Sequence, residues 1–347
     1  MADSRLPMLG RGKKDAAAWA AHAAGALHLA LRARGTLAPR ILAYHRVWDI
    51  GDESRFPWDP ELVSCGVEEF AWQMRWIARH MDPVPLAELL DAQEGRGRLP
   101  QRAVVVTFDD GHRDNYTHAF PVLRETGVPA TVFLSTDYMD SGRTFWFDRV
   151  AHQFHATVQA HVTLPSLGLS FALAGTETRR RAADETLAAM KQVPEAVRLA
   201  ALDELQEAAG VADGAPGSGA LSWTEVADMR TSGLVAFGSH TASHPVLSRL
   251  DEARIRAELG RSRAELVTRD LGDADVLAYP VGGDEAYDER VVRIARECGY
   301  RLGISYTPGV SRFPFEDAFR VRRLHVERYT TRARFAAMLA LPEVFAS

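Results

Sequence analysis

Short runs of apolar residues recur along the chain. Most are continuous rather than alternating, which is typical of strands buried on both faces. Seven runs are predicted as strands: 40–44, 103–108, 130–135, 234–237, 276–279, 302–305 and 321–326. Between them apolar residues recur at helical spacing, as at Phe70, Met74, Ile77 and Met81. Strands that alternate with helices indicate a parallel sheet or barrel, so we predict an α/β fold.

The pattern also suggests how the chain is divided. The third and fourth predicted strands are separated by a strand-like stretch near 160–172, a charged helical stretch near 177–208 and a glycine-rich linker at 213–220. We interpret 142–220 as an insertion between these strands. Asp251 is a predicted helix N-cap, and Gly299 is a predicted helix stop. The predicted divisions are a helical extension (1–38), a main domain (39–335) and a C-terminal tail (336–347).

Composition removes some classes of function. The chain has 347 residues, 46% of them hydrophobic and 25% charged, as in ordinary globular proteins. Its net charge of -5 provides no basic field for nucleic acid, which we do not expect as a partner. Cys65 and Cys298 form neither a disulfide framework nor a zinc-finger spacing. The chain has no Gly-x-Gly-x-x-Gly after the first predicted strand, so a dinucleotide-binding fold has no support. It also has no Gly-x-Ser-x-Gly elbow, which argues against a serine hydrolase.

The N-terminal region bears on location. A basic start is followed by an alanine-rich run that ends at Arg32. This run is too short and too interrupted to span a bilayer, and it lacks a convincing signal-peptide cleavage site. It reads either as a surface helix on the domain or as a basic amphipathic segment in peripheral contact with a membrane. We expect a cytoplasmic protein and leave membrane association open.

Polar residues gather just after the predicted strands. Asp109 and Asp110 follow 103–108, His240 and His244 follow 234–237, and His45 follows 40–44. In parallel α/β folds the carboxyl ends of the strands share one edge, where chemistry is concentrated. These residues are therefore expected to meet although they are far apart in sequence.

Each of these pairs also has an ordinary explanation. Asp109 and Asp110 could be a helix N-cap and a solvated carboxylate, and the two histidines could be polar loop residues. Considered together, they favour a metal site, because two imidazoles and one carboxylate form a known catalytic zinc set. Such a site also accepts other divalent ions. A bound divalent cation would activate water, a carboxylate would take the water's proton, and a histidine would suit protonation of the leaving group.

Three segments in order carry a family resemblance. TFDDG, SHTASHP and AYPVGG resemble motifs of the polysaccharide deacetylase superfamily, the chitin-deacetylase-like carbohydrate esterases. The resemblance extends from near residue 41 to near residue 329. It is closest to the bacterial subgroup with AYPYG-type motifs, often linked to exopolysaccharide systems. It implies a distorted (β/α)7 barrel, Asp109 as catalytic base, and Asp110, His240 and His244 as metal ligands.

The later motifs match less closely. The resemblance implies that Tyr279, Pro280 and Val281 form a groove wall in which the backbone N–H after the proline binds the oxyanion. It implies that His325 is the general acid. The chain departs from the family at Ala278, where many members have arginine, and at Val281, where they have an aromatic residue. The family's aspartate-containing segment, which would supply the partner of His325, is not evident.

Other residues are weaker candidates for substrate contact. His45 lines the site or is a structural histidine, and His112 takes a position where the family often has an aromatic residue. Arg323 shares a strand face with His325, so either side chain could point at the site. The aromatic residues of TFWFD (144–148) form a platform for sugar rings or simply pack in the core.

These residues predict a metal-dependent deacetylase of N-acetylated sugars in a polysaccharide or glycan precursor, with zinc as the favoured metal. Two alternatives remain. One is a deacylase of another class, acting on an O-acetyl ester, a formyl group or a lipid- or nucleotide-linked sugar. The other is a non-catalytic sugar-binding protein with the same fold.

Overall fold

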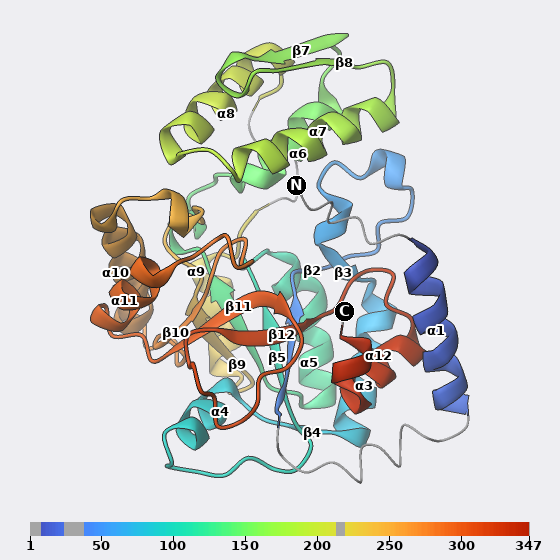
Figure 1. Ribbon diagram of the computed structural model, residues 1–347, viewed down its shortest axis with the longest axis vertical. Helices are drawn as coiled ribbons and strands as arrows, with labels where there is room; N and C mark the ends of the chain where they lie inside the picture. The colour runs from blue at the N-terminus through green and yellow to red at the C-terminus, as the bar shows by residue number, and fades with distance from the viewer. Residues whose placement is uncertain (1–7, 24–37, 213–218, 347) are drawn as a thin grey trace.

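Seven parallel strands close into a barrel at the centre of the molecule (Figure 1). The computed structural model describes residues 8–23, 38–212 and 219–346. Around the ring, the strands follow the order β1-β12-β11-β10-β9-β6-β5 and return to β1. They are β1 (Arg40–Tyr44), β5 (Ala103–Phe108), β6 (Ala130–Leu134), β9 (Val235–Ser239), β10 (Val276–Ala278), β11 (Leu302–Pro308) and β12 (Val321–His325). The predicted α/β barrel and all seven predicted strands are confirmed.

Helices surround the barrel, and a few short strands lie outside the ring. The helices are α1 (Met8–Ala23), α3 (Val67–His80), α4 (Leu86–Gln93), α5 (Phe120–Thr126), α6 (Trp146–Ala156), α7 (Thr176–Met190), α8 (Glu195–Ala209), α9 (Trp223–Thr231), α10 (Glu252–Thr268), α11 (Glu289–Glu297), α12 (Arg332–Ala340) and α13 (Pro342–Phe345). The short strands are β2 (Arg46–Val47), β3 (Val63–Cys65), β4 (Asp82–Pro83), β7 (His161–Leu164) and β8 (Leu169–Ala172). Two predicted helix boundaries are confirmed: the Asp251 side chain caps α10, and Gly299 has a φ of 91° just beyond α11.

Alternate residues of each barrel strand face opposite sides, so the core has two parts. Ile41 and Val105 belong to a buried cluster with Leu86 of α4. Their strand neighbours, such as Leu42, pack instead in the large cluster that contains Phe70 of α3. A residue of a strand points opposite to its neighbour, so the first set faces the barrel interior and the second faces the surrounding helices. This explains why the strands read as continuous apolar runs.

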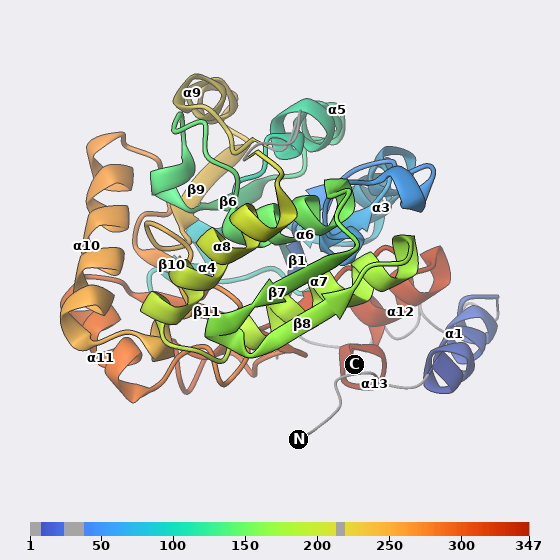
Figure 2. The ribbon, with the colours of Figure 1, turned by 90° about the horizontal axis from the view of Figure 1, so that it is seen from above.

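Between β6 and β9 the chain forms a separate layer over the carboxyl ends of the strands. We call this layer, Trp146–Ala209, the canopy; it contains α6, the β7–β8 hairpin, α7 and α8. Figure 1 shows it above the barrel, and Figure 2 shows it lying across the barrel. The strand-like and helical stretches expected there are confirmed as secondary structure. The insertion boundaries 142–220 stay a prediction, and linker residues 213–218 lie outside the described residues.

The two ends of the described chain lie side by side. Helix α1 packs against α12 (Figure 1), and Trp19 on α1 is 68% exposed. The predicted boundary between residues 335 and 336 falls inside α12, whose residues Phe335 and Leu339 are fully buried, so the fold continues through this point. Among the described residues, no helix combines the length and apolar character needed to cross a bilayer. Cytoplasmic location and peripheral membrane contact stay predictions.

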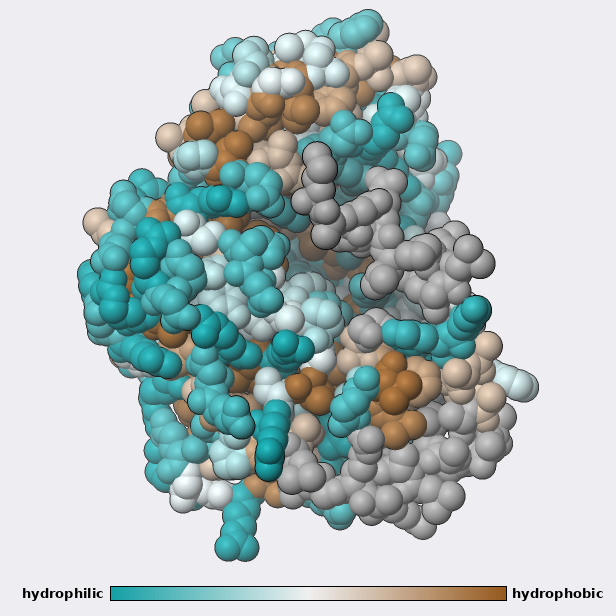
Figure 3. Space-filling model, in the orientation of Figure 1, coloured by the Kyte–Doolittle hydropathy of each residue, from teal (hydrophilic) through white to brown (hydrophobic). Residues whose placement is uncertain are grey.

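The outer surface of α10 and α11 is strongly hydrophilic (Figure 3). Arg293 of α11 pairs with Glu252 of α10 and with Glu297 of its own helix. Arg256 of α10 also pairs with Glu297. Exposed pairs of this kind contribute at most about 1 kcal/mol each, so we interpret this face as solvated surface.

Candidate active site

A pocket of about 290 Å³ lies between the carboxyl ends of the barrel strands and the canopy. It contains residues from both ends of the chain, because the carboxyl ends of all seven parallel strands meet at one rim. Seven of the residues predicted for the site line it: His45, Asp109, Asp110, His240, His244, Tyr279 and Val281. The sequence prediction that these distant segments converge is therefore confirmed.

Asp110, His240 and His244 form a buried group that could hold a metal ion. One possible ligand atom from each residue lies within 4.8 Å of the other two. Oδ1 of Asp110 lies 3.3 Å from Nε2 of His240 and 3.2 Å from Nε2 of His244. Two imidazole nitrogens and one carboxylate oxygen are donors that suit zinc and leave a coordination position open. The residues therefore fit a catalytic divalent metal, on the chemistry and spacing of their donor atoms.

The surroundings of the two histidines direct Nε2 toward this point. Nδ1 of His240 lies 2.8 Å from the carbonyl oxygen of Ala278, so this nitrogen carries the proton and Nε2 is left as a ligand. The Nε1–H of Trp146 lies 3.0 Å from the His244 carbonyl oxygen and 3.3 Å from Nδ1 of His244. Burial lowers the pKa of His244 to about 4, which keeps its ring neutral. Burial also acts on His240, but Asp110 and Asp109 outweigh it and raise the pKa of that ring.

Glu258 of α10 braces the loop that carries both histidines. Its carboxylate accepts hydrogen bonds from the N–H groups of Ala242 and Ser243 at 3.1 and 2.8 Å, and from the Ser243 hydroxyl at 2.9 Å. The N–H of His244 donates to Thr241 Oγ1 at 3.1 Å. The sequence reasoning missed Glu258. Its signal was a carboxylate on the apolar stripe of a helix, where an unpaired charge would be costly.

Asp109 lies beside the metal-site residues and is held by Arg323. The guanidinium donates from Nη1 to Oδ1 and from Nη2 to Oδ2, both at 2.7 Å. Burial alone would raise the pKa of Asp109, but the charge and hydrogen bonds of Arg323, together with the charges of His240 and His45, outweigh it and hold the pKa below its usual value. Asp109 is therefore ionised at neutral pH. Arg323 is fully buried and does not line the pocket, so its predicted substrate contact is replaced by a contact with Asp109.

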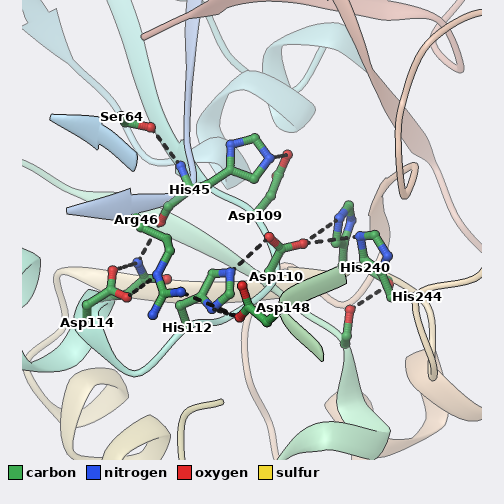
Figure 4. A network of polar contacts seen from close by, with 12 residues as sticks. His45, Arg46, Ser64, Asp109, Asp110, His112, Asp114, Asp148, His240 and His244 are labelled. Carbon is green, nitrogen blue, oxygen red and sulfur yellow. Dashed lines mark hydrogen bonds and ion pairs between the residues drawn. The ribbon is translucent and has the colours of Figure 1, made fainter. Parts of the chain in front are cut away.

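His112 lies behind Asp110 rather than on the pocket wall, which corrects its predicted contact with substrate. Its ring is fully buried, with Nε2 3.2 Å from Oδ2 of Asp110 and Nδ1 3.8 Å from Oδ2 of Asp148 (Figure 4). Neither ring nitrogen has a well-directed hydrogen bond, so these contacts are electrostatic. Arg46 joins the network through Asp148 at 3.5 Å and Asp114 at 2.9 Å. One oxygen of Asp110 thus faces the histidine pair and the other faces a buried charged network.

His325 does not line the pocket, although the resemblance implies that it is the general acid. Its ring stacks on Tyr306, with centroids 3.6 Å apart and planes 13° apart. Nε2 is buried without a hydrogen-bond partner, and the expected aspartate partner is not found at this atom. Burial, followed by the charge of Arg323, lowers the pKa of His325 to about 3. The structure therefore places a neutral His325 behind Tyr306, and Tyr306 itself lines the pocket.

The segment 279–281 forms another part of the pocket wall. Tyr279 stacks on Tyr287 and donates its hydroxyl to the carbonyl oxygen of Phe319 at 3.0 Å. Pro280 is buried and does not line the pocket, which corrects its predicted contact with substrate. Val281 lines the pocket with a φ of 64°, a conformation that a β-branched residue rarely adopts. The oxyanion role of its N–H stays a prediction.

Several pocket residues were weighed only weakly or missed. In the TFWFD segment, Trp146 and Phe147 line the pocket and Phe145 is fully buried. The segment therefore contributes both to the pocket wall and to the hydrophobic core. Asp59 and Tyr306 were missed because nothing in their local sequence marks them. Asp59 lies at the start of a short 3₁₀ turn after β2, and Tyr306 lies on the barrel strand β11. Both side chains line the pocket.

Comparisons with known proteins show the family of this chain. The sequence model of a family described as Polysaccharide deacetylase matches residues 96–303, more than half of the chain. A poly-beta-1,6-N-acetyl-D-glucosamine N-deacetylase of Escherichia coli is 36% identical over 89 residues. That match covers 26% of this chain and only 12% of the relative's own length.

Two solved structures share the fold. The deacetylase PplD of Streptococcus pyogenes, in complex with acetate, has a TM-score of 0.57 at 16% identity, covering 85% of this chain and 95% of that one. IcaB from Ammonifex degensii has a TM-score of 0.55 at 21% identity, covering 88% of this chain and 96% of the other. At this identity the similarity shows a common fold.

Proposed function

This chain belongs to the polysaccharide deacetylase family, and from its site we propose that it is a metal-dependent hydrolase that removes acetyl groups from N-acetylated sugars of a polysaccharide or glycan precursor. One observation carries the proposal: Asp110, His240 and His244 present their donor atoms to one point, and the ionised Asp109 lies beside them. A sugar-binding protein without catalysis has no need for a buried carboxylate that is kept ionised next to a metal-binding group.

Asp110, His240 and His244 would hold the divalent cation, and their donor atoms favour zinc. When bound, the cation polarises the acetamido carbonyl and lowers the pKa of water. The protein's own part is to keep both histidine rings oriented and Asp110 ionised. Asp110 is buried, yet its close contacts with His112, His240 and His244 hold its pKa well below the usual range.

Asp109 is the proposed base. Because Arg323 occupies only one lone pair of each carboxylate oxygen, Asp109 can still accept the proton of the attacking water. The pair also fixes the direction of the carboxylate, since both bonds of the guanidinium fork must be satisfied together. The charge that develops on the carbonyl oxygen needs a donor, and the N–H of Val281 is the one we propose.

The lining of the pocket and a neighbouring depression support a glycan substrate. Trp146 and Phe147 offer aromatic surface, and sugar rings commonly pack on such faces. A second depression of about 140 Å³ shares Asp59 and Leu187 with the pocket as common walls, so the two are neighbours. A neighbouring sugar of an oligomer could extend into this depression. These features support a chain of sugars over an isolated acetylated amine.

Release of acetate from N-acetylglucosamine oligomers tests the proposal. Metal-loaded protein should release acetate, and Asp109→Asn should reduce turnover by at least about 10²-fold while its metal content stays unchanged. Asp110→Ala should lose both metal and activity. Mass analysis of a panel with O-acetyl, formyl and lipid- or nucleotide-linked sugars distinguishes the other deacylase classes. Glycan binding without turnover in metal-loaded protein would replace the enzyme with a sugar-binding protein.

A further inference from the structure

Two of the three candidate metal ligands have a strained backbone. The φ angles of Asp110 and His244 are 71° and 57°, in the left-handed region that residues other than glycine rarely adopt. His240 is not one of the described residues with a positive φ, and its ring is fixed by the Ala278 carbonyl oxygen. Strained conformations persist only where neighbouring groups hold them. Contacts around Asp110 and His244 must therefore keep these two residues in place.

The first turn of canopy helix α6 reaches both strained residues. Its first three residues, Trp146, Phe147 and Asp148, are all buried. Trp146 and Phe147 line the pocket, whereas Asp148 does not. Because a helix turns by about 100° per residue, Trp146 and Asp148 point to nearly opposite sides of α6. One short segment can therefore support two ligands that follow different strands of the barrel.

Trp146 holds the backbone of His244. Its Nε1–H donates to the His244 carbonyl oxygen at 3.0 Å, which is the shorter of its two contacts with this residue. The guanidinium of Arg198, on α8, lies 4.6 Å from the centre of the indole ring in a cation–π contact. Arg198 is itself buried and pairs with Glu195 at 2.6 Å. Two canopy helices thus fix the indole that supports the strained His244.

Asp148 supports Asp110 through His112. Oδ2 of Asp148 lies 3.8 Å from Nδ1 of His112, and Nε2 of the same ring lies 3.2 Å from Oδ2 of Asp110 (Figure 4). Nη1 of Arg46 lies 3.5 Å from the same oxygen of Asp148. These four residues are at most 2% exposed, so the attraction between them is weakly screened by solvent. Asp148 therefore fixes the His112 ring, and the ring fixes the Asp110 oxygen that faces away from the histidine pair.

We propose that the first turn of α6 is part of the metal centre, with Trp146 and Asp148 as positioning residues that keep His244 and Asp110 in their metal-binding orientation. The inference rests on the metal dependence in the proposed function. It gives the canopy a role besides covering the pocket, because a chain without α6 would keep all three ligands but lose the support of two of them. Phe147, between the two positioning residues, lines the pocket, so substrate contact and metal support lie on one helical turn.

Zinc affinity, measured by competition with a chromophoric chelator, tests the inference without any turnover. Trp146→Phe keeps an aromatic face but removes the N–H, and Asp148→Asn keeps the shape but removes the carboxylate. Each should weaken zinc binding by about 10–100-fold, the usual effect of losing a group that supports a ligand. Asp203→Asn, an exposed change on α8 of the same canopy, is the matched control and should change the affinity by less than about twofold.

Double variants separate positioning from general damage to the canopy. Asp148 acts on Asp110 through His112, so adding Asp148→Asn to His112→Phe should weaken zinc binding by less than about threefold further. Trp146 and Asp148 support different ligands, so the effects of Trp146→Phe and Asp148→Asn should multiply to within about threefold. Cobalt(II) in place of zinc gives a visible absorption band that depends on ligand geometry, and each single variant should change the position or intensity of this band.

Unchanged zinc affinity and an unchanged cobalt(II) spectrum in Trp146→Phe and Asp148→Asn would overturn the inference. Weaker zinc binding together with a loss of helical circular dichroism in the metal-free variants would also overturn it, because both residues would then be purely structural. If Trp146→Phe does not fold, Asp148→Asn and its double variant with His112→Phe decide the question. If wild-type protein binds no stoichiometric divalent metal, the proposed function fails too. If it binds zinc and deacetylates oligomers while the variants keep its zinc affinity, only this inference fails.

Discussion

Replacing Arg323 with methionine should destabilise the protein strongly, because it leaves Asp109 buried without its partner. The guanidinium makes two charge-assisted bonds of 2.7 Å to Asp109, and it also donates to Ser305 O at 3.0 Å and to Thr107 Oγ1 at 3.2 Å. Methionine keeps much of the side-chain volume, so lost packing is a small part of the effect. The experiment therefore isolates the buried ion pair.

The expected loss in the free energy of unfolding is about 3–5 kcal/mol, which is the cost of removing one partner from a buried ion pair. Two independent comparisons agree with this size. Two hydrogen bonds to charged groups contribute about 1.5–3 kcal/mol each, and unit charges 4 Å apart attract by about 4 kcal/mol at an effective dielectric constant of 20. The free energy of unfolding of a typical domain is about 5–15 kcal/mol, so the variant should still fold but should unfold at a much lower urea concentration.

The pH dependence of stability should also change sign. In the wild type the pKa of Asp109 lies below its unfolded value, so its contribution is complete above about pH 4 and is lost as the pH falls through the folded pKa. In Arg323→Met, burial is no longer opposed by the guanidinium, and the pKa of Asp109 should rise above the unfolded value. The carboxyl should then cost stability as the pH rises from about 4 toward 7.

Urea unfolding in the presence of a chelator measures both effects without a contribution from bound metal. A double-mutant cycle with Asp109→Asn separates the pair from other losses. The double variant should be more stable than Arg323→Met alone by about 2 kcal/mol, because no buried charge remains. Arg322→Met is the matched control, since this arginine is adjacent on β12 but exposed, and it should change stability by at most about 0.5 kcal/mol. If the effects of Arg323→Met and Asp109→Asn on the free energy of unfolding add within about 0.5 kcal/mol, the two side chains do not stabilise each other and the reasoning is refuted.

Three further changes test other parts of the site. Asp110→Ala should remove stoichiometric metal, measured by elemental analysis, and retained metal would place the ion elsewhere. His112→Phe fills the same space but cannot contact Asp110 Oδ2, so metal affinity in a competition titration should fall by about 10–100-fold; an unchanged affinity would contradict a supporting role. Val281→Gly should raise the free energy of unfolding by about 1 kcal/mol, because relief of strain exceeds the added chain entropy, and a lower melting temperature would contradict this.

The sequence predicted the barrel well because its signals are local. Each barrel strand is a short apolar run, and a strand buried on both faces needs no distant information to be recognised. The residues of the candidate metal site were also predictable, since Asp110 and His240 each lie within two residues of the end of a strand and parallel strands end at one rim. Pattern and topology together bring these residues to one place.

The partners of these residues could not be predicted, because they depend on register. Arg323 and Asp109 are 214 positions apart, and only the alignment of β12 with β1 and of β1 with β5 brings them into contact. The same alignment places His325 a layer below His45. A motif match assigns a role from the position of a residue in the sequence. Whether its side chain can contact the pocket depends instead on its height in the barrel.

Backbone strain gives independent support for the location of the site. Among the described residues, six that are not glycine have a positive φ, and four of them belong to the site segments: Asp110, Thr241, His244 and Val281. Such conformations cost about 1–3 kcal/mol each and persist only where the surroundings hold them. Glu258 holds the histidine loop with three hydrogen bonds, so part of the fold's stability is used to keep His244 in place. A loop that only connected two elements would relax, and we therefore infer that its geometry was selected for the candidate metal site that it forms with Asp110.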